Sequence, residues 1–135
     1  MSSIVGEGNR EAGIYNRAMY SAEVLDHFQN PRNVGDVESP DLSAELQNPV
    51  CGDVLRLTLK VDAGRIVVIR FRAKGCVPVM ACGSALTELV RGRTIEEARH
   101  VTREQLVDRI GGLPKVSSHA GHLAMDTLKA ALGKL

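Results

Sequence analysis

Two short segments of this 135-residue chain carry the side chains best suited to binding a metal or handling sulfur. Residues 48–53 contain Cys51 and Asp53, and residues 74–78 contain Cys76. Thiolates bind soft metal centres such as zinc, copper(I) and iron–sulfur clusters, and a carboxylate adds an oxygen ligand. Cys51, Asp53 and Cys76 are therefore candidate ligands, provided that the fold brings the two segments together.

Strict alternation of apolar and polar residues predicts a strand over residues 53–61. Asp53 shares the parity of the apolar face, so its carboxylate should point toward the covered side of the strand. A carboxylate there is costly unless it is paired, hydrogen-bonded or bound to metal. The alternative is an aspartate that bonds its own backbone in a Cys-Gly-Asp turn. The apolar face consists of Leu55, Leu57, Leu59 and Val61.

A second strand is expected over residues 65–73, after a tight turn at residues 62–64. Joined as an antiparallel hairpin, the two strands would place residues 73–76 opposite residues 51–53. The two cysteine-bearing segments would then meet at the open end of the hairpin. A shorter strand is expected earlier, over residues 42–46. The apolar face of the second hairpin strand should carry Val67, Ile69, Phe71 and Ala73.

A helix is expected directly after Cys76. Pro78 suits the first helical position, and the helix should run to Gly92. A cysteine just ahead of a helix N-terminus feels the positive end of the dipole, which favours thiolate at Cys76. A structural thiol is the alternative there. Cys82 lies on the apolar stripe of the same helix, which is typical of an inert core cysteine.

Two histidines lie on other predicted helices. His119 falls in the first turn of a last helix that begins near residue 117 and runs to the C-terminus. It is either a surface group or a ligand. His27 lies on a short helix over residues 23–28 and is expected to be a surface or capping histidine. The buried side of the last helix should consist of Ala120, Leu123, Ala124, Leu128, Ala131 and Leu135.

Composition excludes several classes of partner. The net charge is +1 with both signs interspersed, and two Tyr and two Phe are too few for base-stacking platforms, so we expect no nucleic-acid partner. The N-terminal residues lack the charged-then-apolar order of a signal peptide, and no apolar run approaches the ~20 residues that span a bilayer, so we expect no membrane partner. We expect a cytoplasmic protein with reduced cysteines, a flexible leader over residues 1–17 and a single domain over residues 18–135.

Several motifs resemble those of one protein family. The run from His27 to Gly35 has the form H-x-x-N-P-R-N-x-G, followed by Cys-Gly-Asp at residues 51–53, Lys-Gly-Cys at residues 74–76, and His119. Over about residues 19–133 the chain is similar to the IscU family of iron–sulfur cluster assembly scaffolds, which includes the N-terminal domain of NifU. The resemblance implies an α+β fold in which a three-stranded antiparallel sheet packs against several helices.

The resemblance also implies a site and partners. Cys51, Asp53, Cys76 and His119 would hold a [2Fe–2S] cluster or a zinc ion. The protein would take sulfur from a cysteine desulfurase and iron from an iron donor, and pass clusters to apo-protein acceptors, without acting as an enzyme.

Two positions depart from the family pattern. The family's third cysteine, directly after the histidine, is replaced here by Ala120. The family's chaperone-recognition segment, of Leu-Pro-Pro-Val-Lys type, reads Leu-Pro-Lys-Val-Ser at residues 113–117. The resemblance therefore does not extend to recognition by that chaperone.

Three hypotheses remain open from the sequence. In the first, the protein is a scaffold or carrier that still holds a [2Fe–2S] cluster or zinc without the third cysteine. In the second, assembly is lost and the protein is a zinc-binding regulatory partner of the desulfurase. In the third, Cys51 or Cys76 carries a persulfide and relays sulfur. Cys82 should play no part in metal binding, because six residues past Cys76 it points to another side of its helix.

Overall fold

A three-stranded antiparallel sheet positions the candidate ligands in the computed structural model, which describes residues 20–135. The predicted hairpin is confirmed, because Val54 at the start of one strand pairs with Lys74 at the end of the next. The predicted α+β fold class is confirmed as well. The leader predicted over residues 1–17 lies outside the described residues. The strands, in their order across the sheet, are β1 (Leu42–Gln47), β2 (Val54–Asp62) and β3 (Arg65–Lys74).

A β-bulge near the hairpin turn changes which side chains of β3 are buried. The register shifts between Lys60 and Val61, so that Val61 pairs with Ile66. Val67 is 42% exposed, whereas Ile66 is fully buried. The prediction that Val67 lies on the apolar face is therefore wrong, because period-two alternation does not continue through a bulge. Beyond the bulge the predicted alternation holds, and Phe71 is fully buried.

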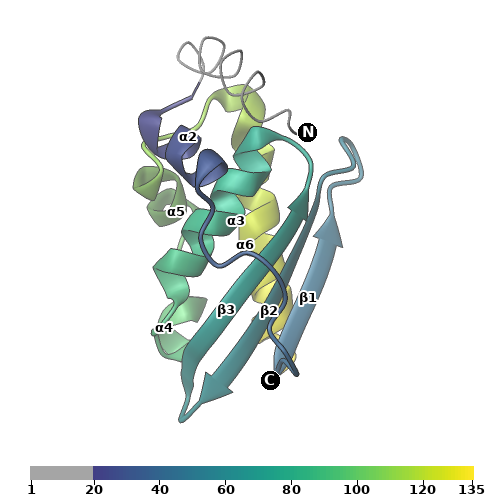
Figure 1. Cartoon of the computed structure of the whole chain (residues 1–135), viewed down its shortest axis with the longest axis vertical. Coiled ribbons are helices and arrows are strands. Elements are labelled where there is room, and N and C mark those ends of the chain that lie inside the picture. The colour runs from purple at the N-terminus through teal and green to yellow at the C-terminus, as the bar shows by residue number, and fades with distance from the viewer. Residues whose placement is uncertain (1–19) are drawn as a thin grey trace.

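Helices cover one face of the sheet, behind the strands in Figure 1. α3 (Val77–Val90) packs against β3, and α6 (Ser118–Leu132) packs against β1 and β2. None of the helices formed by residues 20–135 has the length and apolarity needed to cross a membrane. The shorter helices are α2 (Ala22–Gln29), α4 (Ile95–Arg99) and α5 (Arg103–Arg109), with a 3-10 turn η1 (Lys115–Ser117) ahead of α6.

The opposite face of the sheet is crossed by the coil between α2 and β1, drawn in dark blue in front of β3 and β2 in Figure 1. Val34 forms a parallel bridge with Phe71 at the edge of β3. The N–H of Val37 then donates to Thr58 Oγ1 of β2 at 2.8 Å. This contact explains why Thr58, a polar residue on the outer face of β2, is 1% exposed. The coil therefore covers part of the outer face and leaves the rest open.

Two short helices begin with the same capping interaction, and the last helix ends earlier than predicted. Thr94 and Thr102 begin α4 and α5 with capping boxes, in which the threonine side chain and the residue three positions on bond each other's backbone. The prediction that Leu135 is buried is wrong, because α6 ends at Leu132 and Leu135 is 63% exposed beyond it.

His27 is buried, so the expectation of a surface histidine is wrong. It is 6% exposed, and its Nδ1 lies 2.8 Å from Ser84 Oγ on α3. Its Nε2 lies 3.6 Å from Glu88 Oε1, one turn further along that helix. Ser84 Oγ also accepts the N–H of Arg32 at 2.9 Å, so one hydroxyl ties both α2 and the following coil to α3. Burial, reinforced by the positive charge of Arg32, lowers the pKa of His27.

Acid should destabilise the fold through His27. The folded chain holds His27 neutral, whereas the unfolded chain protonates it near the ordinary value of 6.5, so the unfolded state binds more protons. Stability should therefore be complete above pH 6.5 and fall as the pH drops below that value toward the lowered pKa of the folded state. Urea midpoints measured between about pH 7.5 and about pH 5.5 test this.

His27→Gln should flatten that pH dependence, because the titrating group is gone. His100→Gln is the matched control, since the His100 side chain is 74% exposed, and it should keep the wild-type slope. An equal slope in the wild type and in His27→Gln would contradict the assignment.

Candidate metal centre

The loop between β1 and β2 presents Cys51 to solvent. The N–H of Gly52 donates to the carbonyl of Asn48 at 2.7 Å, and the N–H of Asn48 donates to the carbonyl of Asp53 at 2.8 Å. Asn48 Oδ1 accepts the N–H of Val50 at 2.9 Å. Gly52 has a φ of +79°, a left-handed conformation that glycine adopts without strain. These bonds close the loop, and the Cys51 thiol is exposed on it.

The Asp53 carboxylate is buried between two other candidate ligands. Asp53 is 6% exposed, as its parity in the strand predicts. Its Oδ2 accepts a hydrogen bond from the Cys76 thiol at 3.3 Å and lies 3.5 Å from His119 Nε2. The backbone carbonyl of Asp53 closes the loop instead of its side chain. The alternative of a turn aspartate that bonds its own backbone is therefore wrong.

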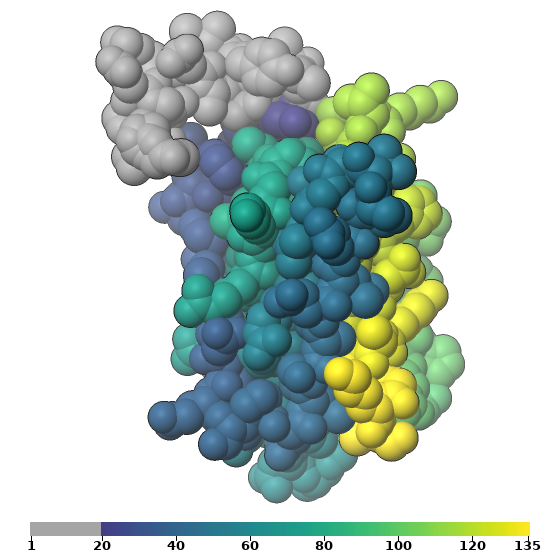
Figure 2. Space-filling model, turned by 90° about the vertical axis from the view of Figure 1, so that its right-hand side faces the viewer, coloured from purple at the N-terminus to yellow at the C-terminus, as the bar shows by residue number. Residues whose placement is uncertain are grey.

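Three donor atoms converge on this point. Cys51, Asp53 and His119 offer a sulfur, a carboxylate oxygen and an imidazole nitrogen that all lie within 4.8 Å of one another. Figure 2 shows how this is possible, because the blue loop that joins β1 to β2 lies close to the light-green segment that leads into α6. Cys76 joins the group through its contact with Asp53. The structure thus brings all four predicted residues together, with Asp53 at the centre.

The surroundings of Cys76 oppose the thiolate expected from the helix dipole. It is the N-cap residue of α3, as predicted. Burial raises the pKa of Cys76 to about 11, and the charge and hydrogen bond of Asp53 add to this effect. The N–H of Val79 acts in the opposite direction but is outweighed. A cation beside Asp53 would reverse the balance, because it favours thiolate over thiol.

Ala120 and Cys82 lie in the core. Ala120 follows His119 in the first turn of α6 and is 1% exposed, so the position of the missing cysteine is filled as part of the hydrophobic core. Cys82 is 0% exposed, and burial raises its pKa to about 12, as expected of an inert core cysteine. His122, one turn beyond His119, is exposed and lies beside Asp126 and Lys129, away from the centre.

Gly75 is a member of the site that the ligand pattern alone does not reveal. Its φ is +149°, and a Cβ added there would lie 2.2 Å from Asp53 Oδ1. Only glycine therefore leaves room for the Asp53 carboxylate beside Cys76. The signal in the sequence is a glycine wedged between the end of a strand and a cysteine that begins a helix.

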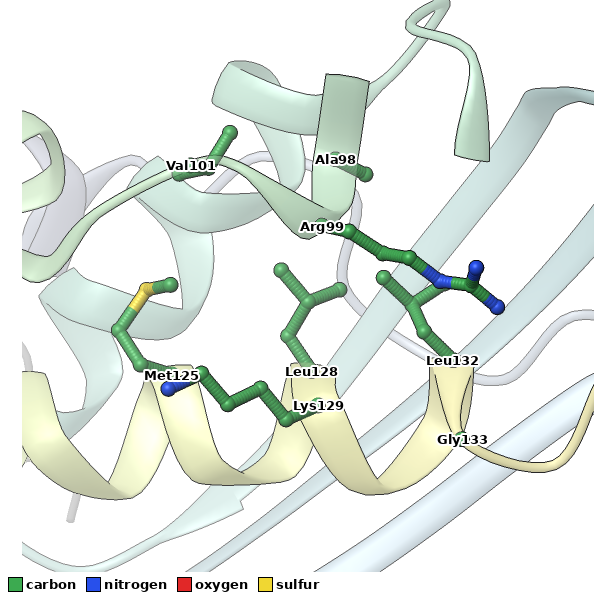
Figure 3. Close-up of a pocket in the computed structure, with 8 residues that line it drawn as sticks. All are labelled: Ala98, Arg99, Val101, Met125, Leu128, Lys129, Leu132 and Gly133. Carbon is green, nitrogen blue, oxygen red and sulfur yellow. The ribbon is translucent and has the colours of Figure 1, made fainter. Parts of the chain in front are cut away.

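An apolar groove of about 210 Å³ lies elsewhere, between α4 and α6 (Figure 3). Its α6 side is formed by Met125, Leu128 and Leu132, while Arg99 and Lys129 flank it. No thiol, imidazole or carboxylate lines it. The groove therefore has no ligands for a metal and no residue in common with the candidate centre.

The NifU-like N-terminal domain family matches residues 19–135 of this sequence. The chain belongs to this family. Its curated relatives include the iron–sulfur cluster assembly scaffold protein IscU 1 of Archaeoglobus fulgidus, which is 46% identical over 114 residues, or 84% of this chain and 74% of that protein. The IscU scaffold protein of Azotobacter vinelandii is 42% identical over 117 residues, or 84% of this chain and 91% of that protein.

Solved structures show the same family fold at lower identity. The FiSufU protein of Fervidobacterium islandicum AW-1 superposes with a TM-score of 0.71 at 21% identity, covering 86% of this chain and 98% of that chain. A NifU-like N-terminal protein of Brucella abortus gives a TM-score of 0.67 at 20% identity. The superposition covers 92% of the present chain and 95% of the Brucella chain.

Asp53→Asn should lower the pKa of Cys76 in this NifU-like domain. The variant removes the negative charge that opposes the thiolate, so the pKa should fall from about 11, while burial, the larger cause, keeps it above the ordinary value of 9.0. The pH dependence of iodoacetamide alkylation at Cys76, resolved by peptide mass spectrometry, measures the change. Asp126→Asn, at an exposed carboxylate on α6, is the matched control and should leave the pKa unchanged. An unchanged pKa in Asp53→Asn would count against the geometry.

Proposed function

We propose that this protein is an iron–sulfur cluster assembly scaffold that holds a [2Fe–2S] cluster, or a zinc ion in its place, at Cys51, Asp53, Cys76 and His119. The supporting observation is the position of the Asp53 carboxylate, in contact with both the Cys76 thiol and the His119 imidazole, with the Cys51 sulfur in the same group. Relatives at 46% and 42% identity carry the name of cluster assembly scaffolds. The cluster is cargo in this proposal, so the protein does not act as an enzyme.

The donor set suits both cargoes. Two sulfurs, one nitrogen and one oxygen match the four ligands of tetrahedral zinc. A [2Fe–2S] cluster also takes four protein ligands, and imidazoles replace thiolates in some proteins. With Ala120 in place of a third thiol, Asp53 supplies the fourth donor. A carboxylate is a harder ligand than a thiolate and suits cluster iron less well, which favours release to an acceptor.

The exposed Cys51 thiol is the proposed entry point for sulfur from a cysteine desulfurase. Its thiolate would attack the outer sulfur of the donor's persulfide, and the donor cysteine would leave as a thiolate. Cys76 is less suited to this first step, because burial raises its pKa to about 11. Among the sulfur-relay alternatives, the structure therefore favours Cys51 over Cys76. Iron from a donor and apo-protein acceptors complete the proposed partners, in a compartment that keeps both cysteines reduced.

Anaerobic reconstitution with iron, cysteine and a desulfurase tests the proposal. We expect about two irons and two sulfides per chain to survive desalting, as a [2Fe–2S] cluster requires. Cys76→Ser should lose most of this cargo, whereas Cys82→Ser should keep it, because Cys82 is fully buried in the hydrophobic core and is not among the converging donors. Retention of zinc alone would favour the regulatory hypothesis, and loss of cargo in Cys82→Ser would overturn the ligand set.

Gly75→Ala should impair loading without touching a ligand. The added methyl group needs the space of Asp53 Oδ1, 2.2 Å away, so the carboxylate must leave the centre. Gly92→Ala is the matched control, since Gly92 also has a positive φ, +85°, with nothing within 4 Å of its Cβ position. Zinc affinity measured by chelator competition should drop at least about tenfold in Gly75→Ala, in the range seen when ligand-orienting groups are lost. Equal losses in both variants would point to backbone strain instead.

A further inference from the structure

β3 carries a row of cations on the sheet face opposite α3 and α6. Arg70, Arg72 and Lys74 occupy alternate positions, and all three are exposed. We call these three residues the basic row. At about 3.4 Å per residue the row is roughly 14 Å long. It ends two residues before Cys76, so it runs up to the candidate metal centre.

The fold does not neutralise the basic row. Arg56 of β2 is paired in register with Arg72, and like charges directly opposite each other are unfavourable. Asp36 relieves this one contact, with Oδ1 3.0 Å from Arg56 Nε and Oδ2 2.8 Å from Arg72 Nε. Both carboxylate oxygens are then used. Arg70 and Lys74 form no ion pair with any residue between 20 and 135.

The surplus of positive charge is local. On the part of this face nearer the metal centre, Arg56 and the basic row put four cations beside two carboxylates, Asp36 and Glu45, the latter paired in register with Arg56. Lys60 and Asp41 lie nearer the hairpin turn. The chain as a whole has a net charge of only +1. A surplus concentrated on a sheet face that the coil between α2 and β1 covers only in part attracts an oppositely charged surface and steers its approach.

We propose that the basic row docks an acidic helix of a partner protein that delivers or receives the cargo of the metal centre. Alternate residues of a strand lie about 7 Å apart on one face. Carboxylates four residues apart on a helix lie about 6 Å apart along its axis, so the two spacings match. Nucleic acid is the less suitable anion, because the chain lacks the aromatic residues that stack bases.

The basic row lies beside the candidate metal centre, so a partner bound to it would lie next to the proposed cargo. Lys74 pairs in register with Val54, the residue directly after Asp53, so a helix laid along the row reaches the edge of the centre. The inference that cargo is exchanged there rests on the proposed scaffold function. The electrostatic docking itself does not depend on that function.

A double charge reversal, Arg70→Glu with Lys74→Glu, tests the docking. The matched control is Arg99→Glu with Lys129→Glu, which makes the same change in net charge at the groove between α4 and α6 (Figure 3). The probe is a fluorescent helical peptide of about 20 residues with glutamate at every fourth position. Fluorescence anisotropy gives its affinity between about 20 and about 300 mM salt.

We expect the reversal on β3 to weaken peptide binding at low salt by at least about tenfold and the control by less than about twofold. Amide chemical shifts of the wild type should move on β3 when the peptide is added. Equal weakening in both variants, or shifts spread away from β3, would overturn the proposal. Tighter binding of a single-stranded oligonucleotide of equal charge would overturn it in favour of nucleic acid.

Cluster loading of the same variants separates this inference from the scaffold proposal. Neither Arg70 nor Lys74 is a proposed ligand, so the reversed variant should load iron and sulfide like the wild type. Failure of the wild type to load would count against the scaffold function alone. Normal loading with undiminished peptide binding in the reversed variant would count against the docking alone.

Discussion

The burial of one carboxylate, Asp53, is the constraint on which the site depends. An isolated buried charge is costly, and here the cost is offset by a thiol donor and an imidazole within 3.5 Å. Strand alternation aims Asp53 inward, the hairpin returns Cys76 to its side, and the start of α6 adds His119. Gly75 then leaves the space that the carboxylate occupies. Each element contributes one partner, so the site forms only when the sheet and α6 are both in place.

In the proposed scaffold, the same interaction would couple metal binding to the protonation of Cys76. Asp53 helps to hold Cys76 as a thiol, since a thiolate would place a second negative charge beside the carboxylate. A divalent cation placed between them inverts this relation, because it favours both anions at once. Binding must therefore release the thiol proton, so metal affinity should increase with pH. Asp53 thus acts on Cys76 in opposite directions before and after cargo arrives.

Much of this arrangement could be predicted from local patterns. The alternation in residues 53–61 was sufficient to place Asp53 inward, and the short turn was sufficient to bring residues 51–53 and 73–76 together. The errors arise where a distant or non-periodic effect dominates. A bulge at Lys60 and Val61 exchanged the environments of Ile66 and Val67.

Two further errors share one cause, which is burial by segments far away in the sequence. His27 is buried because Ser84, on another helix, provides its hydrogen-bond partner. Burial and Asp53 raise the pKa of Cys76 although it lies at a helix N-terminus. Local sequence patterns indicate whether a residue lies at a helix N-terminus, but they do not indicate which distant segments bury it.

Ala120 shows how the fold and the chemistry of the site can change independently. At 1% exposure it is an ordinary core residue, and cysteine packs in cores much as a small apolar residue does. Losing the thiol therefore costs the fold little. Around a divalent cation, two thiolates and Asp53 leave one surplus negative charge, whereas a third thiolate would leave two. Because surplus charge in a partly buried site is unfavourable, the present donor set bears less electrostatic strain when loaded, at the expense of one strong sulfur ligand. For the proposed scaffold, the substitution would therefore give a centre that holds its cargo more weakly.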